Sequence, residues 1–445
     1  MGSKRLKAIA VSGSQRVPIA SSVSFLEAAT QWSDSLSTTA TPHPARGLKN
    51  AGVLRLVSGL GGQEHRILGP GYQHYLLASR NMSDPESGRT LVESFTDSLP
   101  NWQIEPQPAF NCPIGCSYNC HITTGPMAGY TAHVDGGFEN VEGGIMLGIE
   151  DAGVAMMMTD YFDAIGIDSA DPGSLLGMAF ELYNRGLITK EDTDGLELTW
   201  GNHEAAVALL DKMMKGEGIG ALLAHGLKEA ARALHPDAHK FLVHVKGAGI
   251  NLHDWRARGM WAMLFSQFVG SAGATHGGWG VESWTLEPDL GYVEWSDPFL
   301  PEKGKIAEKV EETRRTRTKK LWEDCHGVCW FATWGVKDIL TLGPRAVSLA
   351  TGWEEMGPQE ALTIGERVDN LLRLFCVQRG FSKEDEFDIG PRLLEAPASG
   401  PAAGKTIAPY LADMVDEYYR QMGWEVATGR PTPQTLARLG LAEYA

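Results

Sequence analysis

The spacing of apolar residues along the chain predicts a mainly helical protein. In HEAAVALLDKMMKGEGIGALLAHGLKEAARAL, residues 203–234, apolar positions recur at i, i+3, i+4 and i+7, as in amphipathic helices. The glycine-rich stretch from Gly216 to Gly220 interrupts this pattern and predicts a turn between two helices. Residues 174–188 and 406–424 have the same helical spacing, and Gly186 is the expected end of the first of these.

Two short runs predict strands instead of helices. Residues 5–14, RLKAIAVSGS, form a β-branched and apolar run that ends in Gly-Ser. Because one strand cannot satisfy its own backbone groups, we expect it to pair with a later strand or with a sheet outside this chain. Residues 239–247, HKFLVHVKG, are a possible later strand and a plausible domain boundary, whereas residues 382–405 are expected to be loop.

Composition excludes several classes of protein. The chain has 445 residues, enough for two or three domains, with 43% hydrophobic and 21% charged residues, as in packed globular proteins. A formal charge of −16 disfavours binding to nucleic acid. There is no apolar run long enough to span a membrane, and the N-terminus is too polar for a signal peptide. Six cysteines do not make a secreted disulfide scaffold, so we expect a reduced, cytoplasmic location.

Half of the cysteines lie in FNCPIGCSYNC, residues 110–120. They are Cys112, Cys116 and Cys120. Iron–sulfur clusters need four thiolates, usually several from one tight loop and one from a distant segment. Pro113 and Gly115 prevent a regular helix in this loop, and Cys329 in EDCHGVC is the distant candidate. A zinc site that uses cysteines with His121 or His326 is an alternative on spacing alone.

Two hexapeptides resemble each other, DAIGID at 163–168 and DCHGVC at 324–329. Each has an Asp, a Gly three residues later, an aliphatic residue and then a ligand-type residue. A carboxylate can accept two hydrogen bonds from a guanidine-like edge, and a glycine lets the backbone approach a flat ligand. One Asp-x-x-Gly is a common turn, but the pair indicates a shared kind of ligand.

Together these stretches resemble the tungsten-dependent aldehyde ferredoxin oxidoreductases. The resemblance rests on CPIGC, both hexapeptides, LITKEDTDGLELTWGN (187–202) and the C-terminal run from VQRGFSKEDEFDIG to DEYYRQMGW, all in the same order. It implies a mainly α fold with two helical domains of that family's type. These would occupy residues 21–245 and 246–445, preceded in residues 1–20 by a remnant of an N-terminal β-sheet domain.

The resemblance also implies cofactors. The family holds one tungsten or molybdenum between two pterin-dithiolenes, a bis-molybdopterin, beside a [4Fe–4S] cluster. By position, one pterin would be contacted by Asp163, Gly166, Ile167 and Asp168, and the other by Asp324, Gly327 and Val328. The cluster ligands would be Cys112, Cys116 and Cys329, with Cys120 as a substitute for the cysteine that the family normally has at position 109, here Ala109.

The activity implied by the resemblance is oxidation of a small aldehyde to a carboxylic acid, with ferredoxin or a similar carrier as electron acceptor. Glu142, in FENVEGGIMLG, would take a proton near the metal, and His276, in GSAGATHGG, would donate one to the carbonyl oxygen. Aromatic walls of the substrate pocket are expected from Trp255, Trp279, Trp330 and Phe331. The chain would form a homodimer or join a partner subunit that supplies the missing N-terminal domain.

Three alternatives stay open at the level of the sequence. A reductase of aromatic thioesters would share the same catalytic architecture. A non-catalytic remnant or scaffold subunit would keep the helical body but lack the base of the cofactor site, which Ala109 and the short N-terminus favour. A zinc-stapled binding protein would use the same cysteines without redox chemistry.

Overall fold

The chain is described by a computed structural model, which covers residues 6, 8–37, 87–134, 144–168, 170–250, 256, 261–271, 306–333, 336, 338–354, 356–397 and 403–444. The α-helices are α1 (Ser22–Ser37), α5 (Ser87–Ser98), α7 (Ala152–Ile165), α8 (Ala170–Asn184), α9 (His203–Lys215), α10 (Gly218–Leu223), α11 (Leu227–Leu234), α12 (Trp261–Val269), α13 (Ile306–Asp324), α14 (Ile339–Thr351), α15 (Pro358–Val377), α16 (Leu411–Met422) and α17 (Pro433–Arg438). The strands are β1 (Gln103–Pro106), β2 (Tyr118–His121), β3 (Thr131–Val134), β4 (His244–Val245) and β5 (Ala248–Gly249). The predicted mainly α fold is confirmed.

Side chains that cap the backbone fix where several helices begin and end. Helix α7 begins after Asp151, whose carboxylate accepts a hydrogen bond from the Val154 N–H at 2.9 Å. The Asn202 side chain caps α9 in the same way, and α9 ends at Gly216, whose φ of 67° is left-handed. The expected interruption at Gly216 is confirmed. The second predicted helix divides again before α11, so the segment forms three helices instead of two.

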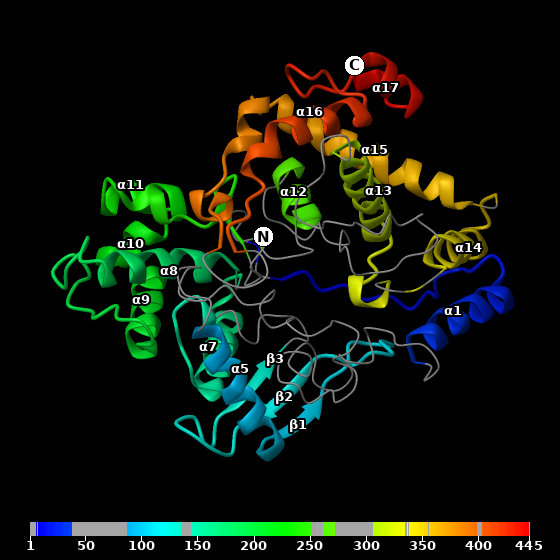
Figure 1. The fold of residues 1–445 in the computed structure, drawn as a ribbon. Helices are drawn as coiled ribbons and strands as arrows, with labels where there is room; N and C mark the ends of the chain where they lie inside the picture. Colours follow the sequence, from blue (N-terminus) through cyan, green and yellow to red (C-terminus); the bar gives the residue numbers. More distant parts are fainter. Residues whose placement is uncertain are drawn as a thin grey trace.

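The larger sheet is antiparallel with the strand order β1-β2-β3. Cys120 lies opposite Ile104 on one side and Ala132 on the other. Helix α7 packs against β3, and α5 packs against α7, so this part of the chain is a small sheet with helices on it. Figure 1 shows this unit below the rest of the molecule. Of the predicted strand in 239–247, only His244–Val245 is a strand, β4, which pairs with β5, whereas Ala238–Phe241 form a short 3-10 helix.

The remaining helices form groups around this unit (Figure 1). Helices α8 to α11 lie on one side, where α9 packs against α10. Helix α13 packs against α12, α15 and α16, and α1 packs against α14 on the opposite side. One hydrophobic core draws residues from 36 to 424, and a second lies within 147–242. The first core takes residues from both sides of position 245, and the predicted division of the chain there stays a prediction.

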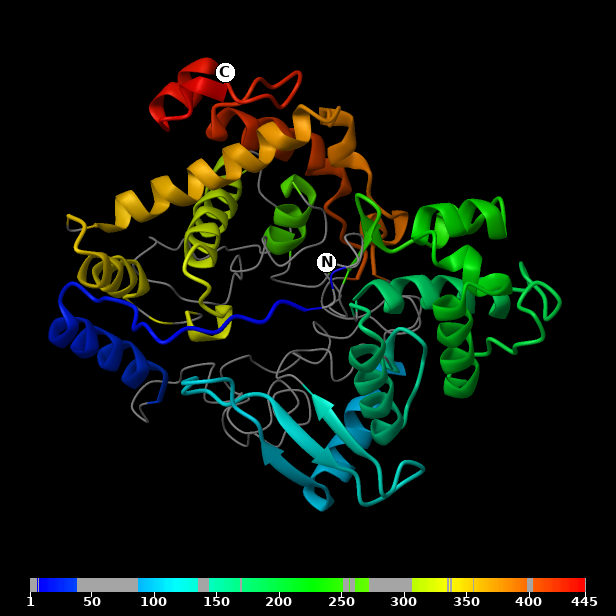
Figure 2. The ribbon, with the colours of Figure 1, turned by 180° about the vertical axis from the view of Figure 1, so that it is seen from behind.

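The N-terminal run does not form the predicted strand in its described residues. Positions 6 and 8–19 have extended backbone without strand pairing, and Figure 2 shows this arm crossing the molecule before α1. Its apolar side chains are exposed: Ile9 by 71%, Val11 by 93% and Val17 by 85%. The arm joins the body at Ala20 and Ser21, whose N–H groups donate to the carbonyls of Ala350 and Leu349 on α14. The run therefore pairs with no later strand in the described part, and the other expectation, pairing with a sheet outside this chain, stays a prediction.

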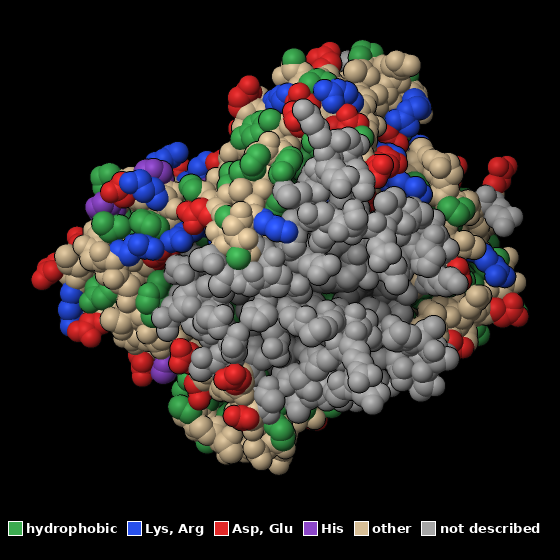
Figure 3. Space-filling model, viewed as in Figure 1, with side chains coloured by type: hydrophobic (Ala, Val, Ile, Leu, Met, Phe, Trp, Pro, Cys, Tyr) green, Lys and Arg blue, Asp and Glu red, His purple; other side chains and the backbone are tan. Residues whose placement is uncertain are grey.

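Charged side chains of both signs are interspersed over the helices on the face in Figure 3. Around α9 to α11, Lys and Arg lie next to Asp, Glu and His instead of forming one large patch of a single sign. Among the helices that the structure describes, none is both long enough and apolar enough to cross a membrane.

Candidate functional site

The two hexapeptides adopt the same turn at the ends of two different helices. In the first, the Gly166 N–H donates to the carbonyl of Asp163 at 3.1 Å, and Gly166 has a φ of 76°. In the second, the Gly327 N–H donates to the carbonyl of Asp324 at 3.1 Å, and Gly327 has a φ of 62°. Only glycine adopts this left-handed conformation without strain, so the shared glycine has a structural reason in both turns.

Both turns are open to their surroundings. The side chains of Asp163 and Asp168 are exposed, and Asp324 pairs with Lys320 one helical turn earlier. A Cβ built on Gly166 or on Gly327 would meet no atom within 4 Å. Packing within the described chain therefore does not require glycine at these positions, and the space beside each glycine is open.

A pocket lies beside each turn. The first turn's Ile167 lines a pocket of about 320 Å³ together with Asp171, Met213 and residues of α10. Burial raises the pKa of Asp171, although the Gly249 N–H, 2.6 Å from its carboxylate, opposes the shift. The second turn's Val328 lines a more apolar pocket of about 300 Å³ between α1, α13 and α14. Thus the aliphatic residue of each hexapeptide borders a cavity.

The cysteine loop is tightly turned, as Pro113 and Gly115 predict. Its backbone has left-handed φ angles at Asn111 (57°) and Gly115 (59°), and no helix forms. The Cys112 N–H donates to the carbonyl of Ala109 at 3.0 Å, which closes the turn. Cys112 and Cys116 are half-buried and pack against the first core.

Cys120 lies in a different environment from its neighbours in the loop. It points into the core from β2, its exposed fraction is 0%, and burial raises the pKa of its thiol to about 12. Metal ligation needs the thiolate, which such an environment disfavours. Cys329 lies at the other extreme, exposed just after the second turn.

Among the described residues, no three His, Cys, Asp or Glu side chains converge closely enough to hold a metal ion. The structure therefore does not bring the predicted cysteine ligands together as a cluster site. Trp330 and Phe331, which follow Cys329, pack against the same hydrophobic core as Cys112 and Cys116. The cysteine loop and the segment after the second turn therefore both pack on the first core.

The other predicted site residues lie outside the described residues. These are Glu142 and His276, with the expected pocket walls Trp255 and Trp279. Trp330 and Phe331 are described; their ring centroids are 5.5 Å apart, and both are partly buried.

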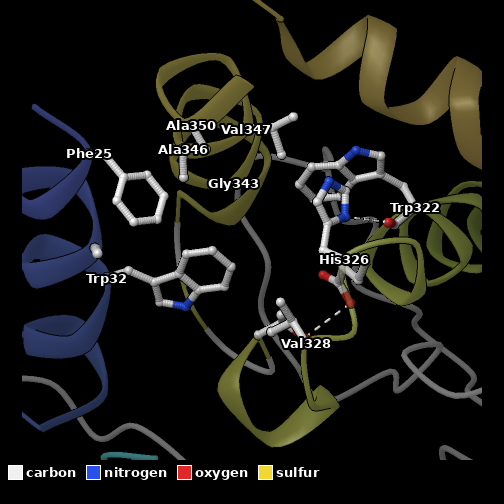
Figure 4. A pocket seen from close by; sticks show the side chains of 12 residues that line it. Phe25, Trp32, Trp322, His326, Val328, Gly343, Ala346, Val347 and Ala350 are labelled. Atoms are coloured by element: carbon white, nitrogen blue, oxygen red, sulfur yellow. Dashed lines mark hydrogen bonds between the residues drawn. The ribbon is translucent and has the colours of Figure 1, made fainter. Parts of the chain in front are cut away.

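The sequence reasoning missed the pocket between α1, α13 and α14. Its aromatic lining comes from Phe25 and Trp32 on α1 and from Trp322 and His326, which straddle the end of α13 (Figure 4). The spacing of Trp322 and His326, four residues apart, is the signal that would have placed both on one helical face.

These observations fit one of the two expected cofactors. Two exposed Asp-x-x-Gly turns, each with no atom close to its glycine, leave room for two flat ligands such as the pterins of a bis-pterin centre. The described residues do not fit an iron–sulfur cluster, because three thiolates do not converge and Cys120 is held neutral. The structure thus defines a mainly helical protein in which two helices end in Asp-x-x-Gly turns with a left-handed glycine.

The family model for aldehyde ferredoxin oxidoreductase, domains 2 and 3, matches residues 48–441. The chain belongs to this family. It is 29% identical over 455 residues to the tungsten-containing aldehyde ferredoxin oxidoreductase of Pyrococcus abyssi, covering 100% of this chain and 68% of that one. The enzyme of the same name from Thermococcus kodakarensis gives the same identity and coverage over 454 residues. This chain is therefore shorter than these relatives.

Two other matches come from multi-subunit systems by their names. The aliphatic sulfonate oxidoreductase, WOR-like subunit, of Pyrococcus furiosus is 29% identical over 346 residues, 75% of this chain and 50% of that one. Among solved structures, the active site complex BamBC of benzoyl coenzyme A reductase, with 1,5 dienoyl-CoA, superposes with a TM-score of 0.72. That alignment covers 98% of this chain and 67% of the other at 16% identity, which shows a shared fold.

Proposed function

We propose that this chain is the helical part of an oxidoreductase that oxidises small aldehydes to carboxylic acids. Its electrons would pass to ferredoxin or a similar carrier. The observation that carries the proposal is the pair of similar Asp-x-x-Gly turns, 161 positions apart, within a chain that belongs to the aldehyde ferredoxin oxidoreductase family.

Each turn would hold one pterin of a tungsten or molybdenum centre. Asp163 and Asp168, with the backbone at Gly166 and Ile167, would contact the first pterin. Asp324, with the backbone at Gly327 and Val328, would contact the second. When bound, the metal supplies a Lewis acid and an acceptor for two electrons.

The residues proposed for proton transfer, Glu142 and His276, lie outside the described residues. Conversion of an aldehyde and water to a carboxylic acid releases two electrons and two protons. Glu142 would take a proton from the water or the aldehyde hydrate, and His276 would donate a hydrogen bond to the carbonyl oxygen as charge develops. Cys112, Cys116 and Cys329 stay proposed ligands of an iron–sulfur cluster, although their side chains do not converge in the described structure.

Partner subunits are part of the proposal. One relative is named a subunit, and the structural neighbour is named a complex of two components. The exposed apolar side chains of the arm at 8–19 are consistent with a neighbour that would cover them.

The test compares three glycine variants of the full chain, produced in cells supplied with tungstate. Gly166→Ala, Gly327→Ala and Gly186→Ala all replace a glycine of positive φ where an added Cβ meets no atom within 4 Å. Each substitution therefore carries the same backbone cost of about 1–2 kcal/mol. Only the two hexapeptide variants should lose tungsten, by about tenfold or more, together with aldehyde-dependent reduction of a viologen dye.

The outcomes separate the alternatives. Equal tungsten loss in all three variants, or no loss in any of them, would contradict the proposal that the two hexapeptide turns hold the pterins. Full tungsten with turnover of aromatic thioesters but not aldehydes would identify the thioester reductase. Neither tungsten nor molybdenum, even with candidate partner subunits coexpressed, would favour the non-catalytic subunit, and zinc alone would favour the zinc-stapled protein.

A further inference from the structure

The pocket between α1, α13 and α14 is a cavity of about 300 Å³ built almost entirely from hydrocarbon surface. Phe25 and Trp32 of α1 face Ala346 and Ala350 of α14 across it, and Trp322 closes a third side (Figure 4). A volume of this size is at the lower end of the range for small-molecule sites.

Most polar groups that border this cavity have partners, but the indole N–H of Trp322 is buried without a hydrogen-bond partner among the described residues. The Thr333 hydroxyl donates to Glu323 at 3.0 Å, and Glu323 also pairs with Lys319 at 2.9 Å. The indole N–H of Trp32 donates to the carbonyl of Ala332 at 2.8 Å. His326 Nδ1 lies 2.8 Å from the carbonyl of Trp322 and so carries its proton there. A ligand with several donors and acceptors would therefore lose its water and leave most of these groups without a hydrogen bond.

The charge beside the cavity selects further against anions. Glu323 is 2% exposed, and its carboxylate borders the space from which a ligand excludes water. A carboxylate placed there would lose its water without gaining a cation, because Lys319 already pairs with Glu323. Enclosed apolar cavities accept molecules such as benzene, and this pocket, which is partly open, offers the same kind of surface.

We propose that this cavity is a binding site for small, uncharged aromatic molecules. The aromatic walls at Phe25, Trp32 and Trp322 offer ring faces and edges to a planar ligand, whereas the small residues of α14 leave it room. A pterin is a poor occupant, because its many donors and acceptors would be left unpaired. The proposal depends on the cavity alone and not on a metal centre.

The experiment measures binding of 4-fluorotoluene and of 4-fluorobenzoate to the full chain by fluorine NMR. The two probes share a ring and differ in charge. Saturable binding of 4-fluorotoluene is expected, with 4-fluorobenzoate bound at least about tenfold more weakly. Equal binding of both probes, or no saturable binding of 4-fluorotoluene, would overturn the proposal.

Two leucine variants locate the site. Ala346→Leu fills the cavity and should weaken 4-fluorotoluene binding by about tenfold or more. Thr341→Leu adds a leucine to an exposed position of the same helix, outside the cavity, and should leave binding unchanged. Unchanged binding in Ala346→Leu would place the probe elsewhere. Since protein without tungsten serves equally well, failure here leaves the proposed aldehyde oxidation untouched, and the reverse also holds.

Discussion

The thiol of Cys120 lies between apolar neighbours on the central strand of the sheet. It is fully buried, and its pKa is raised to about 12 because burial penalises the thiolate. The sequence grouped Cys120 with Cys112 and Cys116 because spacing reports only distance along the chain. Side chains of a strand point alternately to its two faces, and on β2 this alternation directs Cys120 into the core. The spacing of cysteines along the sequence does not reveal this direction.

Cys120 should make stability depend on pH in the alkaline range. Its folded pKa is raised, so its contribution is complete below the unfolded pKa and is lost as the pH rises towards the folded value. Between pH 8 and 10.5 the wild type should lose about 2 kcal/mol of unfolding free energy that Cys120→Ala does not lose. Urea unfolding at both pH values measures this difference. Cys329→Ala, at an exposed position, should follow the wild type.

Glu386 is a second residue whose importance depends on burial. It is 0% exposed and accepts from Arg373 at 2.7 Å, Lys246 at 2.6 Å and Tyr419 at 2.9 Å. Glu386→Gln should cost about 3–5 kcal/mol in urea unfolding, because two buried cations lose their counter-charge. The matched control is Glu197→Gln, which removes an exposed pair with Lys190 at 2.6 Å. A midpoint for Glu386→Gln as close to wild type as that of the control would refute the prediction.

At the scale of elements, helix α13 shows most clearly what the sequence does not reveal. Its sequence, IAEKVEETRRTRTKKLWED, has few apolar residues, and nothing in its pattern predicts burial. The structure nevertheless buries Lys309, Arg317 and Lys319. Ion pairs make this possible: Arg317 makes a bidentate pair with Asp369 of α15 at 2.9 Å, whereas Lys309 and Lys319 pair with Glu312 and Glu323 of the same helix. Helices with an amphipathic pattern, such as α9 and α16, were predictable because their own sequence contains the signal.

The contact between α13 and α15 depends on Gly365. A Cβ at this position would overlap the backbone carbonyl of Thr318 on α13. In an ordinary helix Gly→Ala is stabilising by about 1 kcal/mol. Here Gly365→Ala should instead lower the unfolding free energy, because overpacking of a close helix pair costs about 1–3 kcal/mol. Gln359→Ala, at an exposed position of the same helix, should be nearly neutral. Stabilisation by Gly365→Ala would contradict the close approach.

At the scale of the whole molecule, the fold class and the paired turns were predictable, and the convergence of distant segments was not. Each hexapeptide is a local signal, since its glycine forms a turn with its own Asp. The cavity between α1, α13 and α14 joins residues that lie about 300 positions apart, such as Phe25 and Trp322. Local sequence patterns do not predict contacts between such distant residues, because the packing between helices decides which of them meet.

The N-terminal arm should be separable from the helical body. Residues 8–19 expose their apolar side chains, and anchoring to α14 begins only at Ala20. Brief trypsin treatment should cut after Arg16 and leave the urea midpoint of the remaining chain unchanged. Mass spectrometry of the products and unfolding of the trimmed protein check this together. A clear fall in the midpoint would show that the arm stabilises the body.

Gly343 gives experimental control over the shape of the aromatic cavity. A Cβ there would overlap the far edge of the Trp322 indole, which rests directly on the backbone of α14. A single methyl group at this position would therefore push the indole away from the helix and towards the enclosed space. Graded substitutions at this one position would change the size of the cavity stepwise and leave every other lining residue intact.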